Sequence, residues 1–177
     1  LIDEQPIKKL IDEIDKCGHD VGVHFSYDTY KNYNKIKDEL TEFNSSSDLR
    51  EKKSRQHYLR WCSISTPKLL YEAGIENDFT VGFSDHVGFR SGTCYKYKLY
   101  DLVSREILNI YETPLLVMDV SLYSEKYMNI SSLDQIIDLL DQLTKECKHY
   151  NGIFSAVWHN NQLNQKDHRF IFEHLID

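Results

Sequence analysis

The sequence predicts an α/β fold with a mostly parallel sheet. Short runs of apolar and β-branched residues alternate along the chain with segments that have the 3.6-residue period of amphipathic helices. The run PLLVMDVSL at 114–122 is almost continuously apolar, as expected for a strand covered on both faces. Strands that alternate with helices are typical of parallel sheets, because each parallel connection needs a crossover segment.

In the first half of the chain, glycine and proline mark the helix ends. Ile7, Ile11 and Ile14 recur at helical spacing ahead of Gly18, which suits the C-terminal cap of a helix. A later helix begins at STPK, with proline at its first position, and ends at a glycine. The expected elements are a helix ending at Gly18, a strand at 19–24, a helix at 31–43, an extended segment at 55–61, a helix at 65–74 and a strand at 78–83.

In the second half, the stretch at 84–100 shows neither period and contains two glycines. We expect it to be an ordered loop, pinned by Arg90 and by Tyr95 or Tyr97, because ordered loops of this length are usually functional. The elements expected after it are a strand at 114–122, a helix at 132–148, a strand at 152–160 and a helix at 165–175. No internal repeat or linker is found, so residues 1–177 are predicted to form a single domain.

Composition and charge exclude several classes of function. The 177 residues carry 21 basic and 28 acidic side chains, a net charge of −7, which argues against a nucleic-acid partner or an anionic membrane surface. No apolar run approaches the roughly 20 residues that span a bilayer. The four cysteines form no CxxC pair, so neither a zinc knuckle nor a disulfide framework is indicated. Their spacing suits a reducing compartment, and we expect the cytoplasm.

Two expected strands end in histidine. GHDVGVHFSY places His24 at the end of one strand, and GIFSAVWHN places His159 at the end of another. The carboxyl ends of parallel strands converge on one face, where ligands bind, so we expect His24 and His159 to share that face. Two imidazoles there can serve as a metal ligand and a proton donor. Alternatively, each histidine caps its strand or binds a loop.

Arginine is the other unusual feature. SRQHYLRW carries Arg55 with His57 and Tyr58, and GFRSGT places Arg90 near glycines. Glycine-rich backbone approaches a ligand closely, and the guanidinium fork suits a carboxylate. The structural alternative is that Arg55 and Arg90 pair with acidic residues such as Asp85 or Asp119 and brace the rim.

These segments, in this order and together with AGIENDFTVGF, KLYD and ETPLLVMDVSL, resemble the polysaccharide deacetylase family, carbohydrate esterase family 4, with the NodB-homology fold. The likeness is greatest to a bacterial branch with a GFR-G-T loop and a terminal W-H-N, and it runs from about Asp12 to Asn160. The resemblance implies a distorted (β/α) barrel with fewer than eight strands. It also implies a carbohydrate substrate and a divalent metal, often zinc, that assists removal of an N- or O-acetyl group.

The resemblance assigns roles by position. His24 matches the first histidine of the family's H-x-x-x-H metal motif, and Arg55 matches the arginine that orients the base carboxylate. His159 matches the late histidine that acts as general acid, and Asp119 the group that supports it. The candidates for substrate binding are Arg90, Tyr58 and Trp158.

The chain departs from the family at two motifs. Asp28 stands where the second metal-binding histidine is expected; Asp28 and His57 are the alternative ligands, since carboxylates also bind zinc. The first motif, a strand that ends in two acidic residues, has no counterpart ahead of the first helix. We therefore expect an N-terminally incomplete domain, in which zinc binding is weak or absent. The other reading is a non-catalytic carbohydrate-binding or scaffolding relative of the same fold.

Overall fold

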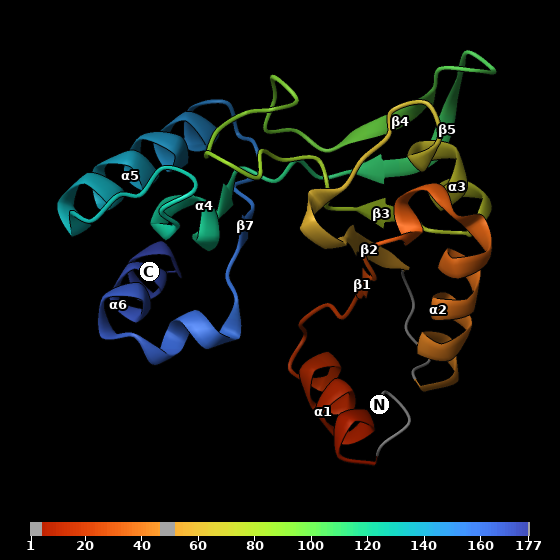
Figure 1. The fold of residues 1–177 in the computed structure, drawn as a ribbon, viewed down its shortest axis with the longest axis horizontal. Helices are drawn as coiled ribbons and strands as arrows, with labels where there is room; N and C mark the ends of the chain where they lie inside the picture. Colours follow the sequence, from red (N-terminus) through yellow and green to blue (C-terminus); the bar gives the residue numbers. More distant parts are fainter. Residues whose placement is uncertain (1–4, 47–51, 177) are drawn as a thin grey trace. The chain divides into compact units, whose positions relative to one another are not determined.

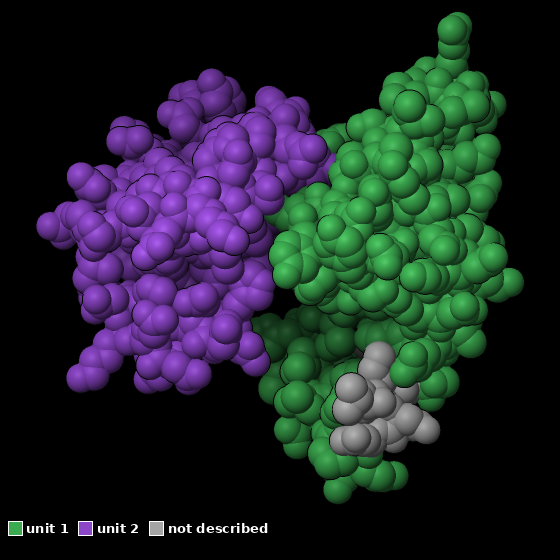
Figure 2. Space-filling model, viewed as in Figure 1, with its two compact units in different colours: residues 1–80, 97–112 green, residues 81–96, 113–177 purple. Residues whose placement is uncertain are grey.

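The computed structural model describes residues 5–46 and 52–176, and the chain divides into two compact units. Unit 1 comprises Leu1–Thr80 and Tyr97–Glu112, and unit 2 comprises Val81–Lys96 and Thr113–Asp177; Figure 2 colours them separately. Each unit has its own hydrophobic core and is described by itself. The assignment of a single domain stays a prediction.

Unit 1 is built on a five-stranded sheet with the order β1-β2-β3-β5-β4 (Figure 1). All neighbouring strands are parallel except β4 and β5, which form an antiparallel pair. The strands are β1 (Val23–Phe25), β2 (Lys53–Gln56), β3 (Asn77–Asp78), β4 (Tyr97–Asp101) and β5 (Glu106–Glu112). The helices are α1 (Gln5–Lys16), α2 (Tyr33–Ser46) and α3 (Thr66–Glu72), with 3-10 helices η1 (Thr29–Lys31) and η2 (His57–Leu59).

The core of unit 1 lies between the sheet and helices α2 and α3. Phe25, Ile36, Leu70 and Ile110 are fully buried there. Helix α3 begins with proline in its first turn and ends before Gly74, whose φ of +82° is the left-handed conformation that ends a helix. This packing holds the carboxyl ends of β1, β2 and β3 in fixed positions.

Unit 2 contains a two-stranded parallel sheet of β6 (Val117–Met118) and β7 (Ala156–Val157). Its helices are α4 (Asp119–Tyr123), α5 (Leu133–His149) and α6 (Lys166–Ile176), with the 3-10 helix η3 (Asn160–Asn164). One stripe of α5 packs into a core that includes Leu122, Ile136, Leu140 and Ile171, all fully buried. The Ser132 hydroxyl caps α5 by accepting the Gln135 amide at 3.4 Å.

The predicted α/β class with a mostly parallel sheet is confirmed, and each predicted helix corresponds to a helix of the structure. Several strand predictions are wrong in extent. The expected strand at 114–122 ends at Met118, because Asp119 begins α4. The extended segment at 55–61 is instead the end of β2 followed by η2, and the expected loop at 84–100 ends in β4, the first strand of a hairpin that the sequence did not predict.

Neither sheet formed by the described residues closes into a barrel. Among these residues, no helix combines the length and apolar character needed to cross a membrane.

Candidate functional site

A row of buried polar side chains crosses three neighbouring parallel strands in unit 1. The register aligns Ser54 of β2 with Asp78 of β3, and Asp78 with Glu112 of β5. All three are buried, and both carboxyl groups lie in fully buried residues. The Asp78 carboxylate accepts hydrogen bonds from the Ser54 hydroxyl and, at 3.1 Å, from the Thr80 amide. Burial nevertheless raises the pKa of Asp78, against the lowering effect of these bonds and of a hydrogen bond with Glu112.

Arg55 lies beside this row. Its Nε donates to the Phe79 carbonyl oxygen at 3.0 Å. Burial lowers the pKa of the Arg55 guanidinium, and attraction to Asp78 and Glu112 partly offsets that effect. The sequence identified Arg55 but neither of these acids, because burial of Asp and Glu is rare and follows here from strand register.

His24 and His57 meet at the ends of β1 and β2. His24 Nε2 and His57 Nδ1 lie 3.0 Å apart, so one ring nitrogen donates and the other accepts. His57 begins η2, in which Tyr58 and Leu59 adopt φ values of 56° and 51°. Left-handed backbone at non-glycine residues costs on the order of 1–3 kcal/mol each and clusters at functional sites. This turn brings His57 toward His24.

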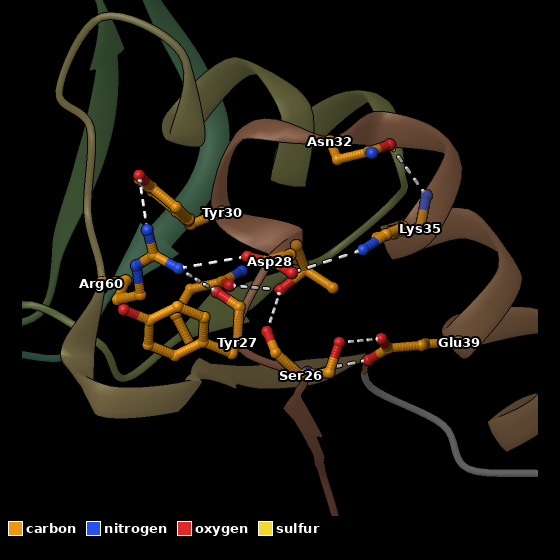
Figure 3. A network of polar contacts seen from close by, with 10 residues as sticks. Ser26, Tyr27, Asp28, Tyr30, Asn32, Lys35, Glu39 and Arg60 are labelled. Atoms are coloured by element: carbon orange, nitrogen blue, oxygen red, sulfur yellow. Dashed lines mark hydrogen bonds and ion pairs between the residues drawn. The ribbon is translucent and has the colours of Figure 1, made fainter.

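Asp28, the other candidate partner of His24, contacts cations instead. Its carboxylate lies 3.4 Å from Arg60 Nη1 and 3.6 Å from Lys35 Nζ, and Figure 3 shows it between these two side chains. Of the two alternatives left open by the sequence, the structure therefore brings His57 beside His24.

The two imidazoles fit part of a zinc site. Two nitrogen ligands at the usual Zn–N distance in tetrahedral geometry lie about 3.3 Å apart, close to the 3.0 Å between His24 Nε2 and His57 Nδ1. Within residues 5–46 and 52–176, no group of three or more His, Cys, Asp or Glu side chains gathers in a way suited to a metal ion. His24, Arg55 and Phe79 are among the residues that line a cavity of about 330 Å³.

Exposed tyrosines flank the histidine pair. The Arg60 guanidinium lies between the rings of Tyr27 and Tyr30, at 3.8 and 4.0 Å from their centroids (Figure 3). Tyr27 and Tyr58 meet edge to face at 5.6 Å and stay 52% and 70% exposed, and Tyr58 also contacts the His57 ring. The sequence identified Tyr58 as a ligand contact and missed Tyr27, whose position depends on Arg60.

In unit 2, a buried carboxylate holds an accessible histidine. Asp119, fully buried at the start of α4, accepts from His159 Nδ1 at 2.6 Å and from the His159 backbone amide at 2.7 Å. The Val120 amide donates to the same carboxylate at 2.7 Å. Because an ionised carboxylate only accepts, the proton of the neutral imidazole lies on Nδ1, and Nε2 is left as the proton acceptor of a ring that is 42% exposed. This is the geometry of an oriented general acid or base.

Aromatic rings pack around this pair. Trp158, expected to bind substrate, contacts Tyr123 and Phe172, and its indole nitrogen is buried. The Tyr123 ring stacks on His168 at 3.6 Å. Burial raises the pKa of Tyr123, reinforced by Asp119 and Asp167, and burial lowers the pKa of His168. Tyr123 and His168 were missed because no motif in the sequence marks them.

Arg90 braces its own loop in unit 2. Its Nη1 donates to the Gly82 carbonyl oxygen at 2.8 Å, while Asp85 contacts His86. The Tyr95 hydroxyl donates to the Tyr150 carbonyl oxygen. Of the expected contacts that pin this loop, those of Arg90 and Tyr95 are thus present.

No protein family model, curated protein or solved structure matches the chain. The expectation that His24 and His159 share one face concerns residues of different units and stays a prediction.

Proposed function

We propose that the protein is a metal-dependent hydrolase that removes acetyl groups from a polysaccharide or an amino sugar. The observation that carries this proposal is the Asp119–His159 pair, an exposed imidazole oriented by a fully buried carboxylate. The resemblance of the chain to polysaccharide deacetylases supports the same reaction, and the distorted (β/α) barrel with fewer than eight strands belongs to this proposal.

Within this proposal, the residues take the roles that the resemblance assigns to them. His159 donates a proton to the leaving amine or alkoxide, and Asp119 keeps its ring in the orientation and tautomer required. Arg55 is the positive charge that orients the base carboxylate. His24 and His57 are the residues that would hold the divalent metal, zinc among the candidates. A bound metal would polarise the acetyl carbonyl and lower the pKa of a water molecule.

Tyr58 and Arg90 are the proposed sugar contacts. Tyr58 presents a largely exposed aromatic ring next to His57, together with Tyr27, and aromatic rings offer an apolar face with a polar edge. Trp158 has its indole nitrogen buried and contributes by packing against Tyr123. We also propose the cytoplasm as the compartment, on the spacing of the four cysteines.

A second candidate is a non-catalytic carbohydrate-binding protein. The observation that favours it is the ligand set: His24 and His57 supply two imidazoles, whereas catalytic zinc usually takes three protein ligands. The exposed tyrosine pair serves either function.

Acetate release from acetylated chitin oligomers tests the proposal in the natural protein that contains this chain, with zinc supplied. We expect His159→Gln to lower the rate by a factor of about 100 or more, the usual contribution of a general acid. The matched control is His174→Gln, which removes another His–Asp contact of unit 2, the 2.8 Å pair with Asp141, and leaves the rate unchanged. Equal rates in wild type and His159→Gln would contradict the proposed role.

A further inference from the structure

Two cysteines that are far apart in the sequence meet in the core of unit 2. Cys94, in the segment that carries Arg90, is 5% exposed, and Cys147, in the last turn of α5, is 2% exposed. Both belong to the same buried cluster and both are free thiols. Their spacing in the sequence gave no sign of this meeting.

Backbone contacts fix the two residues against each other. The Gly152 amide donates to the Cys147 carbonyl oxygen at 2.8 Å, and the next amide, that of Ile153, donates to the Cys94 carbonyl oxygen at 2.8 Å. The Cys147 thiol donates to the Ile153 carbonyl oxygen at 3.7 Å, and Cys94 is close enough to raise the pKa of Cys147. A Cβ atom at Gly152 would lie 2.1 Å from Cys94 Sγ, so glycine there allows the thiol to reach this position.

We propose that Cys94 and Cys147 are a redox-active dithiol site that reacts with a low-molecular-weight disulfide. The thiolate of one cysteine attacks a sulfur of the small disulfide, which forms a mixed disulfide and releases one small thiolate. The second cysteine, as thiolate, attacks the protein sulfur of the mixed disulfide and releases the other small thiolate. The two protein thiols are oxidised to one disulfide, the small disulfide is reduced to two thiols, and the two protons pass to these.

Burial of the pair makes this reaction slow. Burial, with the neighbouring Cys94, raises the pKa of Cys147 to about 11, so little thiolate is present near neutral pH. Cys62 differs, because the nearby polar groups of Ser65 and Ile64 lower the pKa of its thiol. Cys17 is exposed. We therefore expect Cys17 and Cys62 to form mixed disulfides first, and the Cys94–Cys147 disulfide to form more slowly.

The disulfide would link the segment that carries Arg90 covalently to the last turn of α5. Closing a long loop removes entropy from the unfolded chain, and a disulfide of this kind raises the melting temperature of a domain of this size by roughly 5 to 15 °C. In a reducing compartment such a bond forms transiently and reports the redox state. This site is independent of the proposed hydrolase activity.

Peptide mapping of the full chain, equilibrated in glutathione buffers of increasing oxidised fraction, tests the proposal. We expect a peptide linked through Cys94 and Cys147, a higher melting temperature and faster formation as the pH rises. Cys94→Ala removes the linked peptide and the temperature shift, and Cys17→Ser retains both. If Cys94→Ala does not fold, the wild-type map decides alone. Two outcomes would overturn the proposal. In one, Cys94 and Cys147 remain thiols after Cys17 is fully glutathionylated; in the other, either of them forms its disulfide with Cys62.

Discussion

At the residue scale, the candidate site depends on which side chains strand register brings together. Asp78 and Glu112 come from strands far apart in the sequence, and their alignment places two carboxyl groups in one fully buried row. Burial of a carboxylate is costly, so the pair is held by the Ser54 hydroxyl, the Thr80 amide and the nearby Arg55 charge. The raised pKa of Asp78 is the measurable consequence.

Stability should depend on pH through Asp78. Its pKa is raised in the folded protein, so the folded state keeps a proton that the unfolded chain releases near pH 4. The free energy of unfolding should therefore fall as pH rises from about 4 through the folded pKa of Asp78. Asparagine mimics the protonated acid. In urea denaturation from pH 4 to 8, the free energy of unfolding of Asp78→Asn should therefore fall less than that of the wild type. The exposed Asp38→Asn is the control, and identical pH dependence in both variants would contradict this account.

At the element scale, the helices were predictable and the short strands were not. Helix α5 carries an apolar stripe over its whole length, and α3 is bounded by Pro67 and Gly74. The hairpin of β4 and β5 was missed because its turn lacks an Asn-Gly or Asp-Gly signal. Instead, Asp101 accepts the Val103 amide at 2.9 Å and the Ser104 hydroxyl at 2.8 Å, and Arg105 adopts a φ of 59°.

The candidate site was predictable in part. His24, Asp119 and His159 lie at or next to strand ends that the apolar pattern marks, and Arg55 lies in a segment predicted to be extended. The choice of His57 over Asp28 depends on the left-handed turn of η2, which no residue preference predicts.

Gly82 should be essential for the packing of the segment that follows β3. A Cβ atom there would lie 2.7 Å from both Cβ and the carbonyl oxygen of Leu115, whose amide donates to Val81. Gly82→Ala should lower the free energy of unfolding by about 1–3 kcal/mol, the usual cost of overpacking. Chemical denaturation measures this, with the exposed Ser84→Ala as control. An unchanged midpoint in Gly82→Ala would show that the approach to Leu115 is not required.

At the scale of the whole molecule, the two units are interleaved along the chain. Neither unit is one continuous segment, since β5 of unit 1 follows Val81–Lys96 of unit 2. Unit 1 therefore completes its sheet only after part of unit 2 has been synthesised, and β3 pairs directly with β5. This connectivity favours cooperative folding of the chain.

The two tryptophans report on the units separately. Trp61 packs against the core of unit 1 and Trp158 against that of unit 2. Each of the variants Trp61→Phe and Trp158→Phe keeps one tryptophan. In each variant, the urea midpoint followed by fluorescence of that tryptophan should equal the midpoint followed by circular dichroism. Midpoints that differ from the circular dichroism midpoint of the same variant would show two domains instead of one.

The most direct test of the account is the zinc dependence of acetate release in His57→Ala and Asp28→Ala. The natural protein that contains this chain should release acetate from acetylated chitin oligomers as zinc is added. His57→Ala should abolish the zinc-dependent rate because His57 lies 3.0 Å from His24, and Asp28→Ala should retain most of it because Asp28 contacts Arg60 and Lys35. A wild-type protein that binds the oligomers but releases no acetate at any zinc concentration would contradict the hydrolase and favour the binding protein.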